Sequence, residues 1–488
     1  MRHPVQLFIS LVLLFGAPSN APVLAQDGHE GLQVPEVRTL LAQGYTTEDL
    51  ADLVVRDHYT SHGGALRHTF LRQRHAGIEV HNGDIAVHRD GTGRVVALHS
   101  RAVKDLAGRV KATAPGITAM QAMEQVLRAE GLAVHAARQR AGAVDRRQWL
   151  FDGVDGVTGE VTVQLLQLPV DDDVLLVWEV EFHRADGRHW WQVRVDAASG
   201  REVEREDRYT NCGFDEGPGH DHGAEAPPAP PAPAAANDLN VYAMPVESPG
   251  HGPRTLHNAP WTLAPNASPY GWYDVNGAPG AEYTITRGNN VHAQEDANGN
   301  NGTGYSPSGG AGLDFDFPIN LALHPSTYQD AAITNLFYWN NLMHDVWYQY
   351  GFDEASGNFQ MNNYGNGGAA ADEVIADAQD GSGTNNANFA TPPDGSKPRM
   401  QMFLWSGNPP KDCDLDNAVI AHEYGHGISN RLVGGPSNTN CLGNSEQMGE
   451  GWSDFMGLML TMEAGDAGVD ARGVGTYVSG QPSTGPGL

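Results

Sequence analysis

The chain has 488 residues, 40% of them hydrophobic, so it is long enough to bury more than one sizeable core. Acidic residues outnumber basic ones by 59 to 30, which gives a formal net charge of −29. Such a surface argues against binding to nucleic acid or to anionic membranes, and it favours solubility and Ca²⁺ binding.

Residues 1–25 have the organisation of a secretory signal peptide. Arg2 and His3 precede an apolar run from Leu7 to Phe15, and residues 23–25 (Val-Leu-Ala) offer a small-residue cleavage site. The run is too short to span a membrane, and no later stretch reaches the required length. We therefore expect a secreted, extracellular protein without a membrane anchor.

Residues 26–212 are expected to be rich in β-strands. Apolar and polar residues alternate in several segments, namely 66–73, 77–81, 84–89, 174–182 and 190–195. Residues 117–131 have helical periodicity and stop at Gly131. No catalytic constellation emerges here, and an independent binding domain is one interpretation of this region.

Residues 213–236 are expected to be a linker. Residues 227–233 form a Pro/Ala run typical of an extended, semi-rigid spacer. His220 and His222 precede this run, and they are expected to be solvated side chains rather than metal ligands. A protease would cut such a stretch readily, so we expect maturation between residues 205 and 240.

Three features precede the main motif. A helix with a hydrophobic core face is predicted over residues 326–350, and a β-hairpin over 385–391 and 399–405. Asp412, Asp414 and Asp416 are spaced like oxygen ligands, but the loop lacks the glycine and glutamate of an EF-hand. Asp416 is instead predicted to cap the following helix, which ends at Gly434-Gly435.

The strongest signal is the run His422-Glu423-Tyr424-Gly425-His426. Two histidines four residues apart on a helix project from one face, so both imidazoles can bind one cation. Glu423 lies about 100° further round the helix, close enough to hold a water at that cation without binding the cation itself. Zinc peptidases use this arrangement, whereas a surface helix with two solvated histidines is the alternative.

A pair of acidic residues further along the chain, Glu450 and Asp454, completes the predicted metal site. Glu450 is predicted to be the third zinc ligand, and Asp454 is predicted to accept the free ring N–H of a ligand histidine. The alternative, an acidic helix face, would leave both carboxylates in water. The helix that carries them is expected over residues 445–464, with Asn444 and Gln447 forming a capping box.

The class of zinc site follows from the surrounding residues. A metzincin needs Gly and His where this chain has Ser429 and Leu432, and the separate Glu-x-x-x-Asp indicates the glutamate-zincin arrangement. The segments His-Glu-Tyr-Gly-His-Gly-Ile-Ser-Asn-Arg-Leu (422–432) and Gly-Glu-Gly-Trp-Ser-Asp (449–454) closely resemble the fungalysin family of secreted, thermolysin-like metalloendopeptidases.

The resemblance runs from about residue 45 to the end and implies a fold. We expect an α+β, thermolysin-like catalytic lobe at 237–488, preceded by a β-rich α+β propeptide at 26–212. Within the propeptide, residues 59–80 resemble the fungalysin/thermolysin propeptide module, and residues 178–200 resemble a PepSY module. Such prosegments fold with the enzyme and inhibit it until they are cut.

The resemblance also implies function. We expect one Zn²⁺ per monomeric chain, Glu423 as general base, and hydrolysis of internal bonds in protein or peptide substrates. In thermolysin-like enzymes an Asn-Ala edge strand beside the zinc receives the peptide as an added strand, and Asn386 and Ala387 match that pair by position. An ordinary hairpin is the alternative for this segment.

Two features stay open at this stage. Cys413 and Cys441 flank the zinc helix and could form a disulfide or remain two free thiols, while Cys212 stands alone near the linker. After Glu450 the chain contains no histidine and only one tyrosine, Tyr477, although enzymes of this class need an oxyanion donor. We therefore expect a chain that lacks the C-terminal lobe, and the rival interpretation is a zinc-binding fragment or interaction module without activity.

Overall fold

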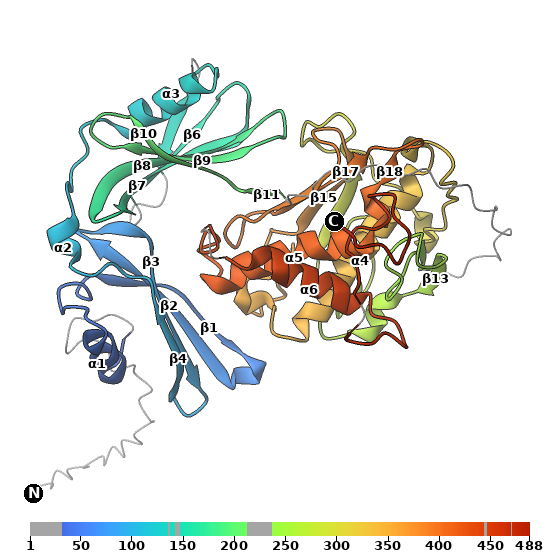
Figure 1. The fold of residues 1–488 in the computed structure, drawn as a ribbon, viewed down its shortest axis with the longest axis horizontal. Helices are drawn as coiled ribbons and strands as arrows, with labels where there is room; N and C mark the ends of the chain where they lie inside the picture. Colours follow the sequence, from blue (N-terminus) through green and yellow to red (C-terminus); the bar gives the residue numbers. More distant parts are fainter. Residues whose placement is uncertain (1–31, 135–136, 142–146, 212–236, 444–446, 470) are drawn as a thin grey trace, which may run out of the picture.

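The computed structural model describes residues 32–134, 137–141, 147–211, 237–443, 447–469 and 471–488. The predicted signal peptide and linker lie outside the described residues, as do Cys212 and Asn444. Helices and sheets are mixed, as expected for the α+β class, and Figure 1 shows two bodies. We call residues 32–211 the N-terminal body and residues 237–488 the C-terminal body.

The N-terminal body is a twisted sheet with helices on its outer side (Figure 1). Its strands follow the order β1-β2-β3-β7-β8-β9-β10, with β4 on β3, β6 on β7, and β5 on β6. A parallel pairing of Val80 with Gln167 joins β3 to β7. It connects two successive parts of the sheet, which we call the first module (described residues of 32–110) and the second module (described residues of 117–211). The elements are α1 (Val34–Ala42), β1 (Leu53–Ser61), β2 (Leu66–His75), β3 (Ile78–Asp90), β4 (Val95–Ser100), α2 (Leu106–Arg109), α3 (Ala119–Ala129), β5 (Arg138–Ala141), β6 (Gln148–Asp152), β7 (Val157–Val170), β8 (Asp173–Arg184), β9 (Trp190–Asp196) and β10 (Glu202–Asp207).

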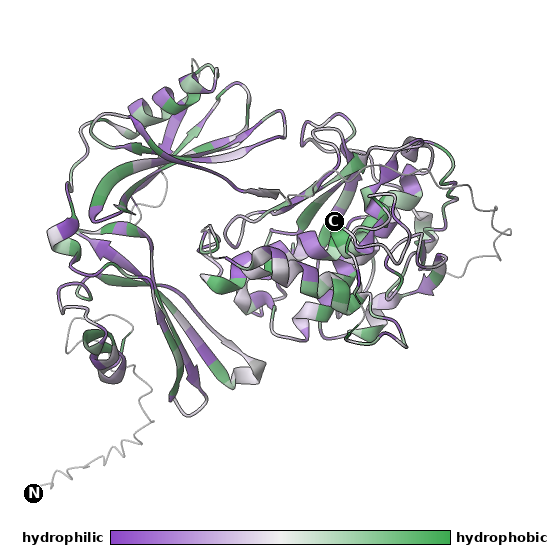
Figure 2. Cartoon of the chain, in the orientation of Figure 1, coloured by the Kyte–Doolittle hydropathy of each residue, from purple (hydrophilic) through white to green (hydrophobic). Residues whose placement is uncertain are grey.

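Helix α3 illustrates why these elements form where the sequence predicts them. Thr118 and Gln121 make a capping box at its start, and Gly131 takes a left-handed φ of 73° just after its end. Its apolar face, including Met123 and Leu127, is buried in a cluster with side chains of β7, β8 and β9. Figure 2 shows hydrophobic and hydrophilic residues mixed along the strands of this body.

The C-terminal body is built on a second sheet, of order β11-β16-β17-β15-β14 with β18 on β17. Strands β14, β15 and β17 run parallel, whereas β16 is antiparallel to β17 and lies between it and β11. Strand β11 (Tyr209–Asn211) comes from the N-terminal body. The elements of the C-terminal body are β12 (Asp238–Val241), β13 (Thr255–Asn258), β14 (Val291–Glu295), α4 (Gln329–Tyr348), β15 (Val374–Asp380), β16 (Ala387–Ala390), β17 (Arg399–Trp405), β18 (Lys411–Asp412), α5 (Asn417–Val433) and α6 (Gly449–Leu460).

Helices α4 and α5 form the core of this body. Helix α4 contacts β14, β15 and α5, and its buried side chains include Leu336, Phe337 and Trp339. It occupies the predicted segment 326–350 except for the first turn, where Pro325 opens a short 3₁₀ helix instead. The predicted hairpin is confirmed as β16 and β17.

Two predictions need correction. Helix α6 begins at Gly449, four residues later than predicted, and Gln447 lies before the helix, where its Oε1 accepts the N–H of Gly449 at 2.5 Å. Cys413 and Cys441 are both buried and are not joined to each other, so the disulfide that the sequence allowed between them does not form. They lie at opposite ends of α5, and 17 helical residues span about 25 Å, far more than a disulfide can bridge.

None of the described helices combines the length and the apolar character that crossing a membrane requires.

Candidate metal centre

Helix α5 carries the histidine motif through the middle of the C-terminal body. Asp416 occupies the N-cap position and Gly434 the C-cap position of this helix, but the predicted capping by the Asp416 side chain is wrong, because this side chain makes no capping hydrogen bond. The Asp416 carboxylate instead accepts the backbone N–H of Val478 at 3.4 Å. Two glycines allow close packing, since a Cβ at Gly425 would lie 3.0 Å from Ser453 Cα of α6, and one at Gly427 would lie 2.7 Å from the Phe389 ring.

The packing of α5 against α6 brings the three predicted ligands together. Nε2 of His422 lies 3.1 Å from Nε2 of His426 and 3.2 Å from Oε2 of Glu450, and the remaining His426–Glu450 distance is 3.5 Å. Ligands at 2.0–2.1 Å from a tetrahedral zinc are separated by about 3.3 Å. The donor set of two imidazoles and one carboxylate therefore fits zinc both in chemistry and in spacing.

Asp454 orients the first of these histidines. Its Oδ1 lies 2.8 Å from Nδ1 of His422, which fixes the ring and directs Nε2 to the metal position. Burial alone lowers the pKa of His422, but hydrogen bonds with Asp454 and Glu450 outweigh it and raise the pKa to about 9. Burial likewise opposes the ionised form of Glu450, yet the two histidines bring its pKa below the ordinary value. A cation entering this set would displace a proton from it.

Glu423 follows the first histidine on the same helix and is fully buried. His422 and His426 are each 2% exposed, whereas the side chains of Glu450 and Asp454 on α6 are 45% and 48% exposed. The site is therefore open on the side of α6 and enclosed on the side of α5. A carboxylate held in such an enclosed place is suited to proton transfer.

The predicted substrate strand lies beside this centre. Ala387 begins β16 and is fully buried, and Asn386 precedes it, with its Oδ1 accepting the N–H of Ala387 at 2.9 Å. Contacts between α5 and β16 place this strand against the helix that carries both histidines.

One edge of β16 pairs with β17, and the opposite edge pairs with a strand of the N-terminal body. Strand β11 pairs antiparallel with β16, with Tyr209 opposite Ala390, Thr210 opposite Phe389 and Asn211 opposite Asn388. A cavity of about 250 Å³ adjoins this pairing, and its lining includes Thr210, Thr391, His426 and Asn430. Sequence reasoning missed β11, because three residues carry no pattern that names a partner strand about 180 positions away.

Comparisons with known proteins agree with this geometry. The family pattern described as Fungalysin metallopeptidase matches residues 238–487, and that of the Fungalysin/Thermolysin Propeptide Motif matches residues 51–102. The chain belongs to the fungalysin family.

Relatives of this fungalysin include extracellular metalloproteinase 2 of Arthroderma gypseum, which is 36% identical over 424 residues. Extracellular metalloproteinase 2 of Trichophyton rubrum is 35% identical over 427 residues, and each of these alignments covers 84% of the present chain and 62% of the relative. Extracellular metalloproteinase 5 of Arthroderma otae is 34% identical over 456 residues, covering 89% of the chain and 66% of that relative. The chain thus spans about two thirds of the length of these curated relatives or slightly less.

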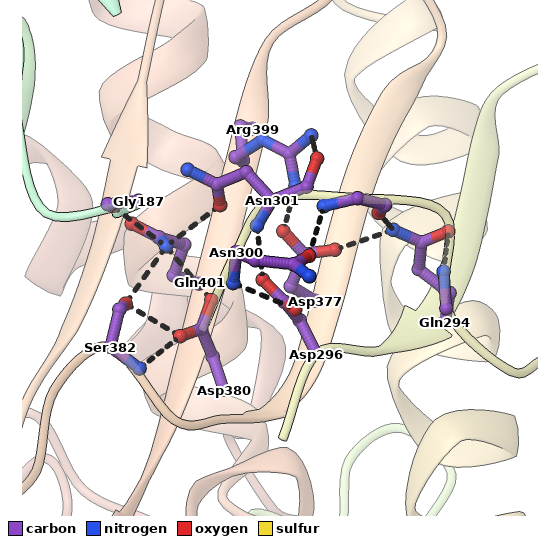
Figure 3. A network of polar contacts seen from close by, with 12 residues as sticks. Gly187, Gln294, Asp296, Asn300, Asn301, Asp377, Asp380, Ser382, Arg399 and Gln401 are labelled. Carbon is purple, nitrogen blue, oxygen red and sulfur yellow. Dashed lines mark hydrogen bonds and ion pairs between the residues drawn. The ribbon is translucent and has the colours of Figure 1, made fainter. Parts of the chain in front are cut away.

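A second acidic group lies in the sheet of this fungalysin, as Figure 3 shows. Carboxylate oxygens of Asp296, Asp377 and Asp380 come within 4.8 Å of one another, and burial raises the pKa of Asp380 to about 7. Protein groups already bind each carboxylate: Asp296 accepts the N–H of Asn301 at 2.8 Å, Asp377 pairs with Arg399, and Asp380 accepts the Gln401 amide at 2.8 Å. Calcium binding stays a prediction of the acidic composition.

Tyr477, the one tyrosine after Glu450, packs into the core of the C-terminal body. The Lys411 ammonium lies 5.1 Å from the centre of its ring, and burial raises the pKa of its hydroxyl well above the ordinary value. This tyrosine is a structural residue, so the structure gives it no part in the metal centre.

Proposed function

We propose that this fungalysin is a secreted zinc endopeptidase, made as an inactive precursor, with a thermolysin-like glutamate-zincin centre. The observation that carries the proposal is the spacing of the His422, His426 and Glu450 ligand atoms next to the buried Glu423. Residues 1–25 serve as signal peptide, 26–212 as prosegment, 213–236 as linker and 237–488 as catalytic part. The names of the relatives, extracellular metalloproteinases, support the same assignment.

The residues of the site have different roles in the proposed reaction. His422, His426 and Glu450 would hold the zinc ion, and the bound ion would supply Lewis acidity to the attacking water and the scissile carbonyl. Glu423 takes a proton from the attacking water and gives it to the leaving amine. Asp454 is a positioning residue, because it acts through the ring of His422.

The substrate binds as an added strand. Asn386 and Ala387 at the start of β16 offer backbone groups and an amide to an extended peptide beside α5. Strand β11 already uses this edge at residues 388–390, so the N-terminal body occupies the place of a substrate. Pairing of β11 with β16 therefore supports inhibition by the prosegment.

The test is casein hydrolysis by the processed protein, with a zinc assay on every sample. We expect activity to be lost with 1,10-phenanthroline and in Glu423→Gln, which keeps its zinc, while the exposed-site control Glu463→Gln keeps full activity. Stoichiometric zinc without hydrolysis in any sample would favour the inactive zinc-binding fragment. A folded protein without zinc would refute the site itself.

A further inference from the structure

A short loop after the helix that carries both histidines makes a second set of contacts with the N-terminal body, beside the substrate strand. We call residues 435–441 (Gly-Pro-Ser-Asn-Thr-Asn-Cys) the docking loop. It begins where α5 ends, and it carries no charged residue. Its side chains are neutral amides, hydroxyls and a thiol.

The first module of the N-terminal body binds one side of this loop through two carboxylates and an arginine. Asp57 Oδ2 accepts the hydroxyl of Ser437 at 2.7 Å, and Asp84 Oδ2 accepts the amide of Asn438 at 2.7 Å. Arg101 donates to the carbonyl oxygen of Cys441 at 2.7 Å.

The second module binds the other side. Arg208 donates to Thr439 Oγ1 at 3.0 Å and to Asn440 Oδ1 at 3.1 Å, and the amide of Asn440 donates to Gln192 at 2.5 Å. A cavity of about 120 Å³ between the two modules is bordered by Ser437, Asn438, Thr439 and Asn440. The loop therefore fills the junction of the modules, where both can contact it at once.

The fit at the base of the loop is close. Gly435 has a φ of 85°, and a Cβ there would lie 2.9 Å from both Asp57 Oδ2 and Phe70 Cγ. Only glycine takes this backbone conformation without strain and leaves room for the N-terminal body.

Two of the charged side chains that bind the loop also form ion pairs within the N-terminal body. Asp84 pairs with Arg72 at 2.7 Å, and Arg208 pairs with Glu181 at 3.0 Å. A neutral loop can donate hydrogen bonds to the carboxylates and accept them from the arginines without adding a charge, whereas a negative charge at Asn438 would face Asp84 directly.

We propose that the docking loop is a recognition surface through which the catalytic part selects its own prosegment, in addition to the β11–β16 pairing. The inference rests on the proposed function, since it identifies the partner of the proposed enzyme. The partner is recognised by its chemistry: two carboxylates and two arginines that converge from successive modules on a neutral amide and hydroxyl surface. Contacts on two separate surfaces hold the prosegment more tightly than either one alone.

The test uses the full chain carrying Glu423→Gln, so that no self-cleavage occurs, with a recognition sequence for a site-specific protease placed in the linker. After cutting, the dissociation rate of the two bodies is measured on a sensor surface. Asn438→Asp places a second carboxylate 2.7 Å from Asp84, and we expect dissociation at least about tenfold faster. The control Asn266→Asp adds the same charge at an exposed site, and its rate should stay within about twofold.

A charge exchange separates recognition from a general loss of fold. Combining Asp84→Asn with Asn438→Asp restores one carboxylate and one amide, and the rate should return to within about threefold of the parent. Asn438→Asp with the parent's rate would overturn the proposal, and so would a double variant as fast as the single one. This measurement does not depend on hydrolysis, so a negative casein assay of the parent protein would refute the proposed function, while a slow dissociation that Asn438→Asp accelerates would still support recognition by the loop.

Discussion

The contact of α5 with α6 at Gly425 predicts opposite effects for the same substitution at two glycines. A Cβ at Gly425 would lie 2.9 Å from Ser453 Oγ, 3.0 Å from Ser453 Cα and 3.2 Å from Met456 Sδ. A Cβ at Gly451, in the first turn of α6, would have nothing within 4 Å. Both positions are helical, so the difference between them comes from packing.

The magnitudes follow from two effects. Glycine to alanine inside a helix gains about 1 kcal/mol of stability, because the backbone loses less entropy on folding. At Gly425 the new methyl group meets a backbone atom that can move only with the whole of α6, and overpacking of this kind costs about 1–3 kcal/mol. We expect Gly425→Ala to lower the free energy of unfolding by about 1 kcal/mol and Gly451→Ala to raise it by a similar amount.

Displacement of α6 by the new methyl group should also weaken metal binding. Since α6 carries Glu450 and α5 carries both histidines, moving α6 lengthens the ligand distances, and Gly425→Ala should bind zinc about tenfold more weakly. Thermal unfolding with and without zinc, together with competition against a coloured chelator, measures both effects. Equal midpoint shifts for the two variants, or unchanged zinc affinity in Gly425→Ala, would refute the reasoning.

Two further predictions concern hydrogen bonds of histidines. Asp454→Asn should weaken zinc binding about 10- to 100-fold, because the His422 ring loses its carboxylate partner; chelator competition measures this, and unchanged affinity would contradict it. At the contact of the two bodies, His183 Nε2 lies 3.1 Å from the Asn301 amide, and burial, then the charge of Arg399, lowers the pKa of His183 to about 4. The contribution of neutral His183 to the free energy of unfolding, up to about 3 kcal/mol, is therefore complete above about pH 6.5 and lost as the pH falls towards 4. In thermal unfolding, the stability difference between the parent and His183→Gln should change over that range. A constant difference would contradict the prediction.

The metal centre could be predicted from sequence because its signal is local. The spacing of His422 and His426 within one helix needs no knowledge of the fold, and Glu450 with Asp454 repeats the same spacing on a second helix. The structure brings three of these side chains within 3.5 Å of one another. Strand β17 and helix α4 were equally accessible, since each has a clear hydrophobic period.

Features that depend on distant partners could not be predicted. Strand β15 reads Val-Ile-Ala-Asp-Ala-Gln-Asp, and its buried Asp377 and Asp380 find partners such as Arg399 and Gln401 only in the folded sheet. The predicted start of α6 was wrong because the Gln447 side chain accepts the N–H of Gly449, so that Gln447 lies before the first turn and not within it. The sequence left open whether Cys413 and Cys441 form a disulfide, and the length of α5 between them decides against it.

The three-residue strand β11 has a consequence for the protein after activation. When it leaves, the backbone of Asn388, Phe389 and Ala390 becomes an uncovered sheet edge, and such edges readily recruit strands from neighbouring molecules. Under the proposed function, the contact that would block substrate would also cover this edge while the protein folds. Removal of the prosegment would then leave the edge free to pair with an extended peptide.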